Sequence, residues 1–216
     1  MKAIVVAGGS AAPGDAAQLS GADLVIAADS GAAWLAAEGM RPDLVVGDMD
    51  SIDPALLERL AADGVKVERH PAEKDASDAE LAIDRAVVAG ADEVVIIGAL
   101  GGGRLDHELA NLLLLADPRW RAVRLRIVRA GTVAQAVRGG ELLSLSAAEG
   151  GLVTLLPVGG DAVGVRTAGL RYPLDGETLR MGRSRGLSNV GTRTPASVSL
   201  EGGTLLVIEA EKEASR

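Results

Sequence analysis

The first half of the chain alternates short apolar runs with segments of helical spacing. The apolar runs cover 4–7, 24–27, 44–46, 65–67 and 94–97. Between them, apolar residues recur every three or four positions over 32–38, 54–62, 79–88 and 105–115. This alternation predicts βαβ units and a mostly parallel sheet covered on both faces. Ligands of such sheets bind beyond the carboxyl ends of the strands. On the last helix we expect Leu105, Leu109, Leu112 and Leu113 to face the core.

After residue 117 the helical spacing disappears. Strand-like runs follow at 123–128, 142–145, 152–156, 196–200 and 205–208, and glycine-containing turns separate them. Closely spaced strands of this kind predict a β-sandwich or a small barrel. We therefore expect an α/β domain with a parallel sheet over residues 1–135, followed by a smaller all-β sandwich domain over 136–216.

Composition narrows the kinds of ligand. The chain has no cysteine, so a metal would need oxygen ligands or one of the two histidines, His70 and His107. Oxygen ligands favour magnesium, manganese or calcium. A formal net charge of −8 argues against a nucleic-acid partner. An acidic protein that binds a nucleotide needs a divalent cation between its carboxylates and the phosphates.

Two further features concern location. No run of about 18 apolar residues is present, which predicts no membrane span and no membrane partner. The N-terminus runs directly into an apolar stretch, without the pattern of a signal peptide. We expect a cytoplasmic protein.

The first acidic loop follows the apolar run 44–46. Asp48 and Asp50 lie one residue apart, so both can reach one cation directly or through its waters. The alternative is a polar loop in which Ser51 or Asp53 caps the helix that begins at Pro54. That alternative leaves Asp48 and Asp50 unexplained.

A second acidic loop precedes the helix predicted at 79–88. Ser77 and Glu80 have the spacing of a capping box, which indicates a structural role. Asp78 could complement the helix dipole, whereas Asp75 lies before the cap and needs another reason. Two acidic loops at one sheet edge repel each other unless a cation lies between them, which favours metal binding for both.

The third loop, 98–107, carries glycines at a strand-to-helix turn. Backbone N–H groups there can approach an anion, and the guanidinium of Arg104 can bind phosphate. The alternative is a mobile turn with a solvated Arg104. A lone histidine such as His107 is more often a hydrogen-bonded structural residue than a ligand.

Six segments in order carry a resemblance to a known family. They are Ala-Asp-Ser-Gly-Ala at 28–32, Pro-Asp-Leu-Val-Val-Gly-Asp-Met-Asp-Ser-Ile at 42–52, Lys-Asp-Ala-Ser-Asp at 74–78, Gly-Gly-Arg-Leu-Asp-His at 102–107, Gly-Leu-Arg-Tyr-Pro-Leu at 169–174 and Gly-Leu-Ser-Asn at 186–189. Together they resemble the thiamine pyrophosphokinase family over residues from about 4 to 208.

The resemblance implies an α/β domain that binds Mg·ATP and carries catalysis, and a β-sandwich that binds thiamine and forms a homodimer with sites between subunits. It implies Mg²⁺ as cofactor, and ATP and thiamine as substrates. The expected metal ligands are Asp48, Asp50, Asp75 and Asp78, and the expected catalytic residues are Asp75, Asp78, Arg104 and Asp106. ATP contacts are expected from Asp29, Ser30, Gly31, Gly102, Gly103, Arg104 and His107, and thiamine contacts from Tyr172, Ser188 and Asn189.

Three positions depart from the family pattern. Ser30 stands where a second glycine is common, and its Cβ restricts the backbone. Ser77 replaces the commoner Thr and keeps the hydroxyl. Val190 replaces the usual polar or acidic residue after Asn189.

The resemblance implies diphosphoryl transfer, in which the thiamine hydroxyl attacks the β-phosphorus of ATP and AMP leaves. One alternative is a nucleotide-sugar glycosyltransferase, because Asp48-Met49-Asp50 is also a D-x-D motif. It explains one loop only. The other alternative is a non-catalytic thiamine or nucleotide sensor of the same fold.

Aromatic residues are scarce, and Trp34, Trp120 and Tyr172 are the only large rings. We expect Trp34 on a core-facing helix, and Trp120 follows a proline near the domain junction. Tyr172 is then the best candidate to stack on the flat, partly cationic thiamine. The alternative is a Tyr172 ring that fills the core of the β domain.

Overall fold

The computed structural model describes residues 1–147 and 149–211. The chain divides into two compact units, Met1–Ala130 and Gly131–Arg216. The sequence pattern placed this boundary at 135. Among the described residues, no helix has the length and apolar character needed to cross a membrane.

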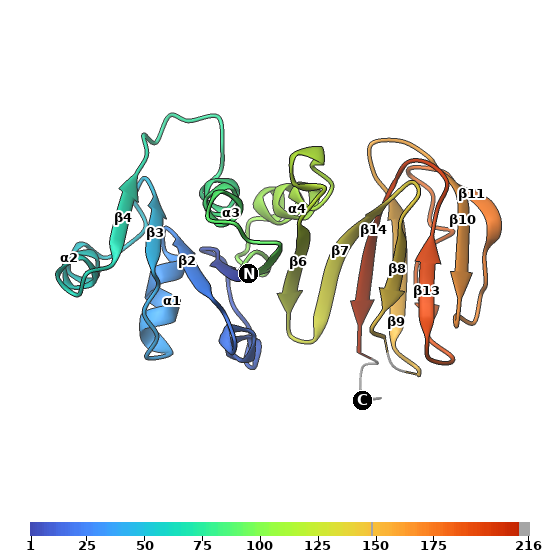
Figure 1. Ribbon diagram of the computed structural model, residues 1–216, viewed down its shortest axis with the longest axis horizontal. Helices are drawn as coiled ribbons and strands as arrows, with labels where there is room; N and C mark the ends of the chain where they lie inside the picture. The colour runs from blue at the N-terminus through green and yellow to red at the C-terminus, as the bar shows by residue number, and fades with distance from the viewer. Residues whose placement is uncertain (148, 212–216) are drawn as a thin grey trace. The chain divides into compact units, whose positions relative to one another are not determined.

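The first unit is built on a parallel sheet (Figure 1). Its strands lie in the order β6-β5-β1-β2-β3-β4, and every neighbouring pair is parallel. Their bounds are β1 Lys2–Val6, β2 Leu24–Ala28, β3 Leu44–Gly47, β4 Lys66–Arg69, β5 Glu93–Ile97 and β6 Arg124–Arg129. The last four residues of β1, β2 and β5 are all buried, as the apolar runs predict.

Strand β6 belongs to the parallel sheet. The sequence pattern listed the run 123–128 with the strand-like runs that follow residue 117, although the predicted boundary at 135 placed it in the α/β domain; in the structure β6 pairs in parallel with β5. Its composition cannot show the difference, because the partner and direction of a strand depend on the connection that precedes it. Here helix α4 (Leu105–Leu114) and the short helix η2 (Pro118–Trp120) return the chain for a parallel pairing.

The other helices of this unit are α1 Gly31–Ala37, α2 Pro54–Ala62 and α3 Asp78–Val88, with a short helix η1 at Asp15–Leu19. Both predicted caps are present. The side chain of Asp53 accepts a hydrogen bond of 3.1 Å from Ala55 N, and Ser77 Oγ accepts one of 3.2 Å from Glu80 N. The Ser77 cap fixes the first turn of α3 and with it the position of Asp78.

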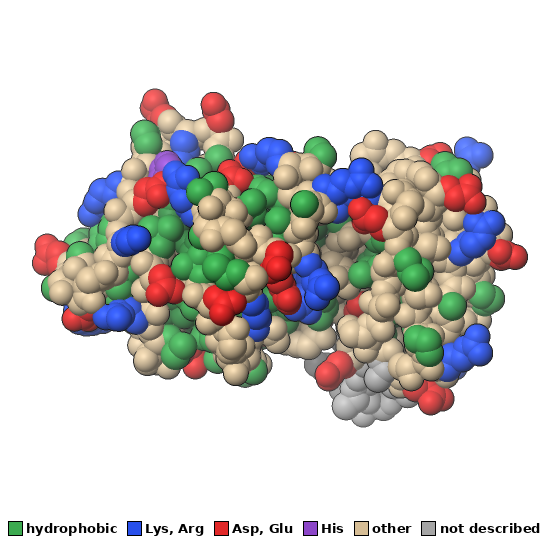
Figure 2. All heavy atoms as spheres, in the orientation of Figure 1, with side chains coloured by type: hydrophobic (Ala, Val, Ile, Leu, Met, Phe, Trp, Pro, Cys, Tyr) green, Lys and Arg blue, Asp and Glu red, His purple; other side chains and the backbone are tan. Residues whose placement is uncertain are grey.

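Helix α4 differs from its prediction. None of its residues, all of which the structure describes, is buried. Leu105, Leu109 and Leu113 are 70%, 52% and 55% exposed, and Leu112 is half-buried. The expected core stripe is therefore wrong: helical spacing shows that a face is apolar, but not what covers it. Figure 2 shows hydrophobic side chains at the surface where Figure 1 places α4.

The order of the strands creates a crevice next to β1. The chain runs outward from β1 through β2 and β3 to β4, and then returns to the other side of β1 as β5. The loops after β1 and β5 touch at the carboxyl edge, where Gly9 N donates to Gly98 O at 2.8 Å. This reversal of strand order is where parallel sheets bind ligands.

The second unit is a β-sandwich. One sheet has the order β12-β9-β14-β7 and the other β11-β10-β13-β8. Val153 and Leu205 from the first sheet and Val165 and Val198 from the second are fully buried in one shared core. The strands are β7 Thr132–Arg138, β8 Leu142–Leu145, β9 Leu152–Pro157, β10 Ala162–Ala168, β11 Asp175–Leu179, β12 Asn189–Val190, β13 Ala196–Ser199 and β14 Thr204–Ala210. The predicted fold class, a parallel α/β unit followed by a smaller antiparallel β unit, is confirmed.

Candidate active site

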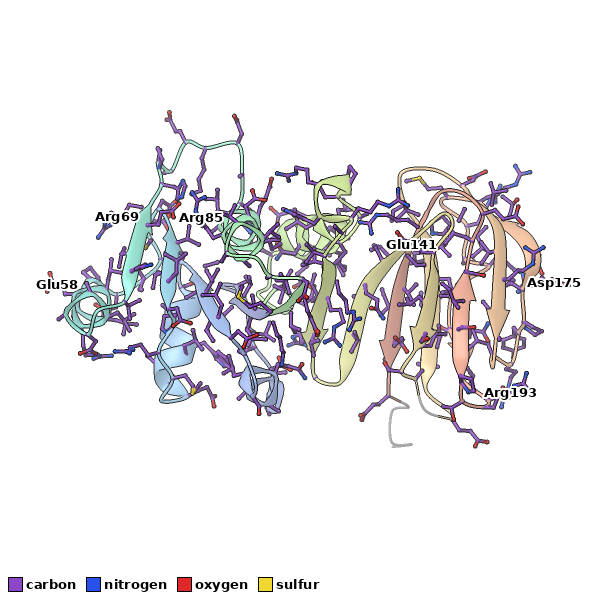
Figure 3. All side chains as sticks on the ribbon, viewed as in Figure 1. Glu58, Arg69, Arg85, Glu141, Asp175 and Arg193 are labelled. Carbon is purple, nitrogen blue, oxygen red and sulfur yellow. The ribbon has the colours of Figure 1, made fainter. Side chains whose placement is uncertain are left out.

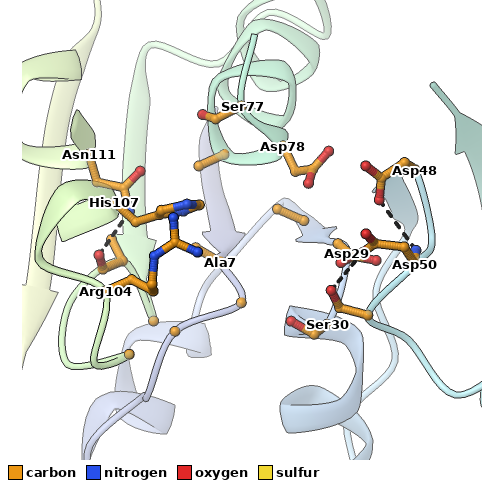
Figure 4. A pocket seen from close by; sticks show the side chains of 18 of the residues that line it. Ala7, Asp29, Ser30, Asp48, Asp50, Ser77, Asp78, Arg104, His107 and Asn111 are labelled. Atoms are coloured by element: carbon orange, nitrogen blue, oxygen red, sulfur yellow. Dashed lines mark hydrogen bonds between the residues drawn. The ribbon is translucent and has the colours of Figure 1, made fainter. Parts of the chain in front are cut away.

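A pocket of about 540 Å³ opens at the carboxyl edge of the parallel sheet. Its lining comes from the loops that follow β1, β2, β3, β4 and β5 and from helix α4, all within the first unit. The three loops singled out from the sequence all contribute. Figure 4 shows the carboxylates on one side of this pocket and Arg104 and His107 on the other.

Three carboxylates converge on the acidic side. Asp29 follows β2, Asp48 follows β3 and Asp78 begins α3, and one oxygen of each lies within 4.8 Å of the others. Asp29 adopts a left-handed backbone conformation, with φ of 46°. Such a conformation is uncommon for a residue with a Cβ and is often found at functional sites. We call these three residues the acidic cluster.

Asp29 is the most buried member of the cluster. It is 7% exposed, and its Oδ1 is buried with no hydrogen-bond partner in the part of the chain that the structure describes. Burial raises the pKa of Asp29, and repulsion from Asp78, Asp50 and Asp48 raises it further, against a hydrogen bond from Ser51. A buried carboxylate oxygen among like charges is well suited to a cation.

Lys74 contacts the other two members of the acidic cluster. Its Nζ hydrogen-bonds Asp48 Oδ2 at 3.1 Å and forms an ion pair with Asp78 Oδ1, also at 3.1 Å. The hydrogen bond from Lys74 is the main reason that the pKa of Asp48 is lowered. Burial lowers the pKa of Lys74, but its contacts with Asp48 and Asp78 outweigh this and raise it. Lys74 begins the second acidic segment, 74–78, but the sequence pattern predicted no role for it.

The donor set fits a hard divalent ion. It consists of carboxylate oxygens, the ligand type that magnesium prefers, and the unpartnered oxygen of Asp29 lies among them. Of the four predicted metal ligands, the structure brings together Asp48 and Asp78. Asp50 lines the pocket but is exposed, and Asp75 is exposed and does not line it.

The third carboxylate of the acidic cluster is Asp29, which was not among the predicted metal ligands. It was expected to contact ATP, not metal. A signal for it was present, because Asp29 directly follows a buried strand, just as the loop of Asp48 does. Parallel neighbours end at the same edge, so both carboxylates must lie close together.

The opposite side of the pocket is formed by Gly102, Arg104, His107 and Asn111. Asn111 Nδ2 donates to Ala99 O at 2.8 Å, which ties α4 to the glycine loop. Of the residues expected to contact ATP, Gly103 does not line the pocket.

Asp106 also lies outside the lining. Its carboxylate accepts hydrogen bonds from Arg104 Nε at 3.0 Å and Arg104 Nη2 at 2.6 Å, and both side chains are exposed. The Arg104 guanidinium holds the pKa of Asp106 well below its usual range. At neutral pH the Asp106 carboxylate is therefore ionised and weakly basic. The Arg104 guanidinium has five N–H donors, more than this pair uses.

The backbone conformation at position 30 does not require a glycine. Its φ of −60° and ψ of −11° are right-handed helical values open to any residue. Ser30 precedes α1 without a side-chain capping hydrogen bond, and it lines the pocket. The next residue, Gly31, is not part of the lining. A Cβ at Gly31 would lie 2.0 Å from Val6 O, so this glycine lets α1 pack against β1.

The residues expected to face thiamine lie together in the second unit. Tyr172 is 55% exposed, so the alternative of a ring that fills the core is wrong. Asn189 is buried, and its amide binds the main chain of Tyr172: Oδ1 accepts from Tyr172 N at 3.0 Å and Nδ2 donates to Tyr172 O at 2.7 Å. Ser188 is exposed, with φ of 56°.

This arrangement assigns Asn189 a structural task. Its amide oxygen also accepts from Val190 N at 2.9 Å, so both ends of the side chain are engaged within the protein. Asn189 fixes the backbone from which the Tyr172 ring projects.

Comparison with known proteins gives two family matches. Residues 16–128, more than half of the chain, match the model described as "Thiamin pyrophosphokinase, catalytic domain". Residues 142–205 match "Thiamin pyrophosphokinase, vitamin B1 binding domain". The acidic cluster and Arg104 lie in the first match, and Tyr172 and Asn189 lie in the second.

Individual relatives carry the same family name as the two family matches. A thiamine pyrophosphokinase of Bacillus subtilis is 28% identical over 187 residues, which cover 87% of each chain. Thiamine pyrophosphokinase 2 of Oryza sativa subsp. japonica is 30% identical over 156 residues, which cover 69% of this chain and 58% of the rice protein. This chain therefore spans less than two thirds of the rice relative.

Solved structures resemble the whole chain. The crystal structure of a thiamine pyrophosphokinase from Bacillus subtilis superposes with a TM-score of 0.87 at 27% identity and covers 98% of this chain and 99% of its own. The corresponding protein of Geobacillus thermodenitrificans gives 0.83 at 28% identity and covers 99% of both chains. These matches favour this family over the glycosyltransferase alternative, which rested on one loop.

Proposed function

Because this chain belongs to the thiamin pyrophosphokinase family, we propose that it transfers the diphosphate group of Mg·ATP to thiamine, giving thiamine diphosphate and AMP. The observation that carries this proposal is the pocket of the first unit, where three carboxylates face Arg104 across a glycine-lined edge. A polyphosphate with a divalent ion needs both kinds of group. The carboxylates hold the ion, and the guanidinium and backbone N–H groups bind phosphate oxygens.

The acidic cluster would hold magnesium through Asp29, Asp48 and Asp78. A bound magnesium ion would offset negative charge on the phosphate oxygens. Asp50 lines the same pocket, and we assign it contact with the ion through a water. The earlier assignment of Asp75 as a ligand stays a prediction.

The reaction forms one P–O bond and breaks another, and the hydroxyl proton of thiamine is released to solvent. The hydroxyl oxygen of thiamine attacks the β-phosphorus of ATP in line, and the bond from that phosphorus to the oxygen bridging to the α-phosphate breaks, so AMP leaves. Phosphoryl transfer of this kind relies on positioning and charge compensation and needs no covalent nucleophile. The low pKa of Asp106 makes it a weak base, which favours a role in hydrogen bonding and in orienting Arg104.

Thiamine would bind against Tyr172 in the second unit. We assign its ring the stacking contact, Ser188 a polar contact, and Asn189 the positioning of Tyr172. We further propose a homodimer with sites between subunits. Helix α4 supports a protein–protein interface, because it exposes Leu105, Leu109 and Leu113. Apolar side chains at i, i+4 and i+8 form one continuous stripe on a helix.

The direct test is product analysis. Purified protein with thiamine, ATP and Mg²⁺ should give thiamine diphosphate and AMP in equal amounts, and a chelator should stop the reaction. ADP with thiamine monophosphate would contradict attack on the β-phosphorus. Turnover of a UDP- or GDP-sugar without turnover of ATP would instead support the glycosyltransferase alternative.

The sensor alternative needs a second measurement on the same protein. Titration calorimetry with thiamine and with Mg·ATP reports binding independently of turnover. Tight binding of both ligands without release of AMP would support a sensor. Sedimentation at several protein concentrations tests the dimer, and a monomer throughout would contradict it.

A further inference from the structure

The side chain of Lys74 reaches into the acidic cluster. Its ammonium is 3.1 Å from Asp48 Oδ2 and 3.1 Å from Asp78 Oδ1, and the side chain is only 15% exposed. These are two of the three carboxylates that would hold a metal ion. A lysine ammonium and a divalent ion therefore compete for the same oxygens.

The competition is sharpest at Asp48. Its other oxygen, Oδ1, already accepts a hydrogen bond of 3.3 Å from Asp50 N within the loop. Oδ2 is the oxygen that faces Lys74, at 3.1 Å from its Nζ. An ion that binds Asp48 through Oδ2 takes the place that the ammonium holds.

The ammonium of Lys74 compensates negative charge in the acidic cluster. Three carboxylates within 4.8 Å of one another repel strongly, and the ammonium offsets one of their charges. Oδ1 of Asp29 and Oδ1 of Asp78 are both buried without a hydrogen-bond partner among the described residues, and only the Asp78 oxygen forms an ion pair with Lys74, so the compensation is incomplete. Lysine suits a contact that must be released, because its charge is compact and its stem has four flexible carbons.

We propose that Lys74 is an exchangeable counter-ion for the acidic cluster: its ammonium stabilises Asp48 and Asp78 until a divalent ion displaces it. Because Mg²⁺ must break the ion pairs of Lys74 with Asp48 and Asp78, free Mg²⁺ binds weakly. This inference rests on the proposed use of a divalent ion by the acidic cluster, and it assigns Lys74 the task of compensating the charge of the cluster while no ion is bound.

Variants test the competition without nucleotide or thiamine. Mg²⁺ alone is titrated by calorimetry into the wild type, Lys74→Met and Lys74→Arg. Lys74→Met should bind Mg²⁺ about tenfold more tightly than the wild type, equivalent to about 1.4 kcal/mol, because no ammonium competes. Lys74→Arg keeps the charge and can bind carboxylates through two donors at once, so it should bind Mg²⁺ no more tightly than the wild type.

Arg104→Gln is the matched control for charge alone. Arg104 lines the same pocket but contacts Asp106, not the acidic cluster. Its loss should tighten Mg²⁺ binding much less than the loss of Lys74. Equal tightening in both variants, or unchanged or weaker binding in Lys74→Met, would overturn the exchange.

A spectroscopic measurement on the wild type follows the ammonium itself. The sequence contains only four lysines, so the ¹⁵Nζ and ¹³Cε signal of Lys74 can be assigned by its loss in Lys74→Arg. Mg²⁺ should shift this signal, whereas NaCl of matched ionic strength should not. A signal that stays in place throughout the Mg²⁺ titration would overturn the proposal. Turnover of thiamine is measured separately, so either proposal can fail while the other stands.

Discussion

The side chains of Asp29 and Asp78 approach each other over the α-carbon of Gly47. A Cβ built on Gly47 would lie 3.1 Å from Asp29 Cβ and 3.1 Å from Asp78 Oδ1. Gly47 also has a φ of 150°, which residues with a Cβ rarely adopt. The last residue of β3 therefore leaves the space in which the acidic cluster forms.

Gly47→Ala should lower Mg²⁺ affinity about tenfold, because the added methyl group pushes Asp29 and Asp78 apart. Gly64→Ala is the matched control: its φ of 84° is also unfavourable, but a Cβ there meets nothing within 4 Å. Both variants should lose about 1 to 3 kcal/mol of unfolding free energy. Calorimetric Mg²⁺ titration and thermal melts separate the effects, and wild-type Mg²⁺ affinity in Gly47→Ala would refute this role.

Asp78→Asn should lower Mg²⁺ affinity by more than about tenfold, because it removes one charged oxygen ligand from the acidic cluster. Asp75→Asn tests the ligand expected from sequence. Since Asp75 is exposed and outside the pocket lining, we expect a smaller loss. Titration of Mg²⁺ into both proteins measures the two affinities. An equal loss of affinity in Asp75→Asn and Asp78→Asn would show that Asp75 is a ligand.

Arg104→Ala should raise the KM for ATP about tenfold or more, because a charge-assisted contact with phosphate is lost. The melting temperature should hardly change, since the ion pair of Arg104 with Asp106 is exposed on both sides. Asp106→Asn should raise the KM for ATP by less than Arg104→Ala does, because Arg104 remains but loses the charged partner that orients it. Steady-state kinetics distinguish the two, and an unchanged KM for ATP in Arg104→Ala would exclude the phosphate contact.

Tyr172→Ala should weaken thiamine binding about 5- to 30-fold, the loss of one aromatic or cation–π contact. Because the ring is more than half exposed, the melting temperature should stay close to that of the wild type. Val163→Ala, which truncates a β10 side chain that is 47% exposed, is the control for the loss of exposed apolar surface. Thiamine affinity is measured by calorimetry, and equal affinity in Tyr172→Ala and the wild type would remove Tyr172 from the site.

Asn189→Ala extends this comparison. Loss of the buried amide leaves both main-chain polar groups of Tyr172 without their partners, which should cost about 1 to 3 kcal/mol of stability. Thiamine binding should weaken as well, because the ring loses its fixed backbone. A lower melting temperature in Asn189→Ala but not in Tyr172→Ala would support separate positioning and contact roles.

Glu68 should make stability depend on pH. Its carboxylate accepts hydrogen bonds from Arg85 Nε at 2.8 Å, and the ring of His70 lies 2.7 Å away. Figure 3 shows Arg85 on α3. Chiefly through Arg85, the pKa of Glu68 is lowered from its ordinary value of 4.5. A lowered folded-state pKa adds stability above pH 4.5 that is lost as pH falls through that lower value.

Glu68→Gln should therefore be less stable than the wild type by about 1 kcal/mol at pH 7. The difference should narrow as pH falls below 4.5. Glu58→Gln removes the same charge from an exposed position on α2 and should change little. Urea unfolding across this pH range measures all three proteins, and a constant difference between wild type and Glu68→Gln would contradict the linkage.

The sequence by itself determined the elements and their chemistry. Buried strands such as 94–97 and capped helices such as the one after Ser77 are specified locally, by apolar spacing and by side chains that bond nearby N–H groups. Because parallel strands end at one edge, the sequence also placed Asp48, Asp78 and Arg104 around one pocket.

Only the tertiary structure decided which groups meet. Local pattern could not show that β6 joins the parallel sheet, that the leucines of α4 stay exposed, or that the Tyr172 ring points outward. Nor could it show Lys74 between Asp48 and Asp78, or Asp29 completing the acidic cluster in place of Asp75. These relationships join residues from different loops, and their distances depend on the packing of whole strands and helices, which no short segment specifies.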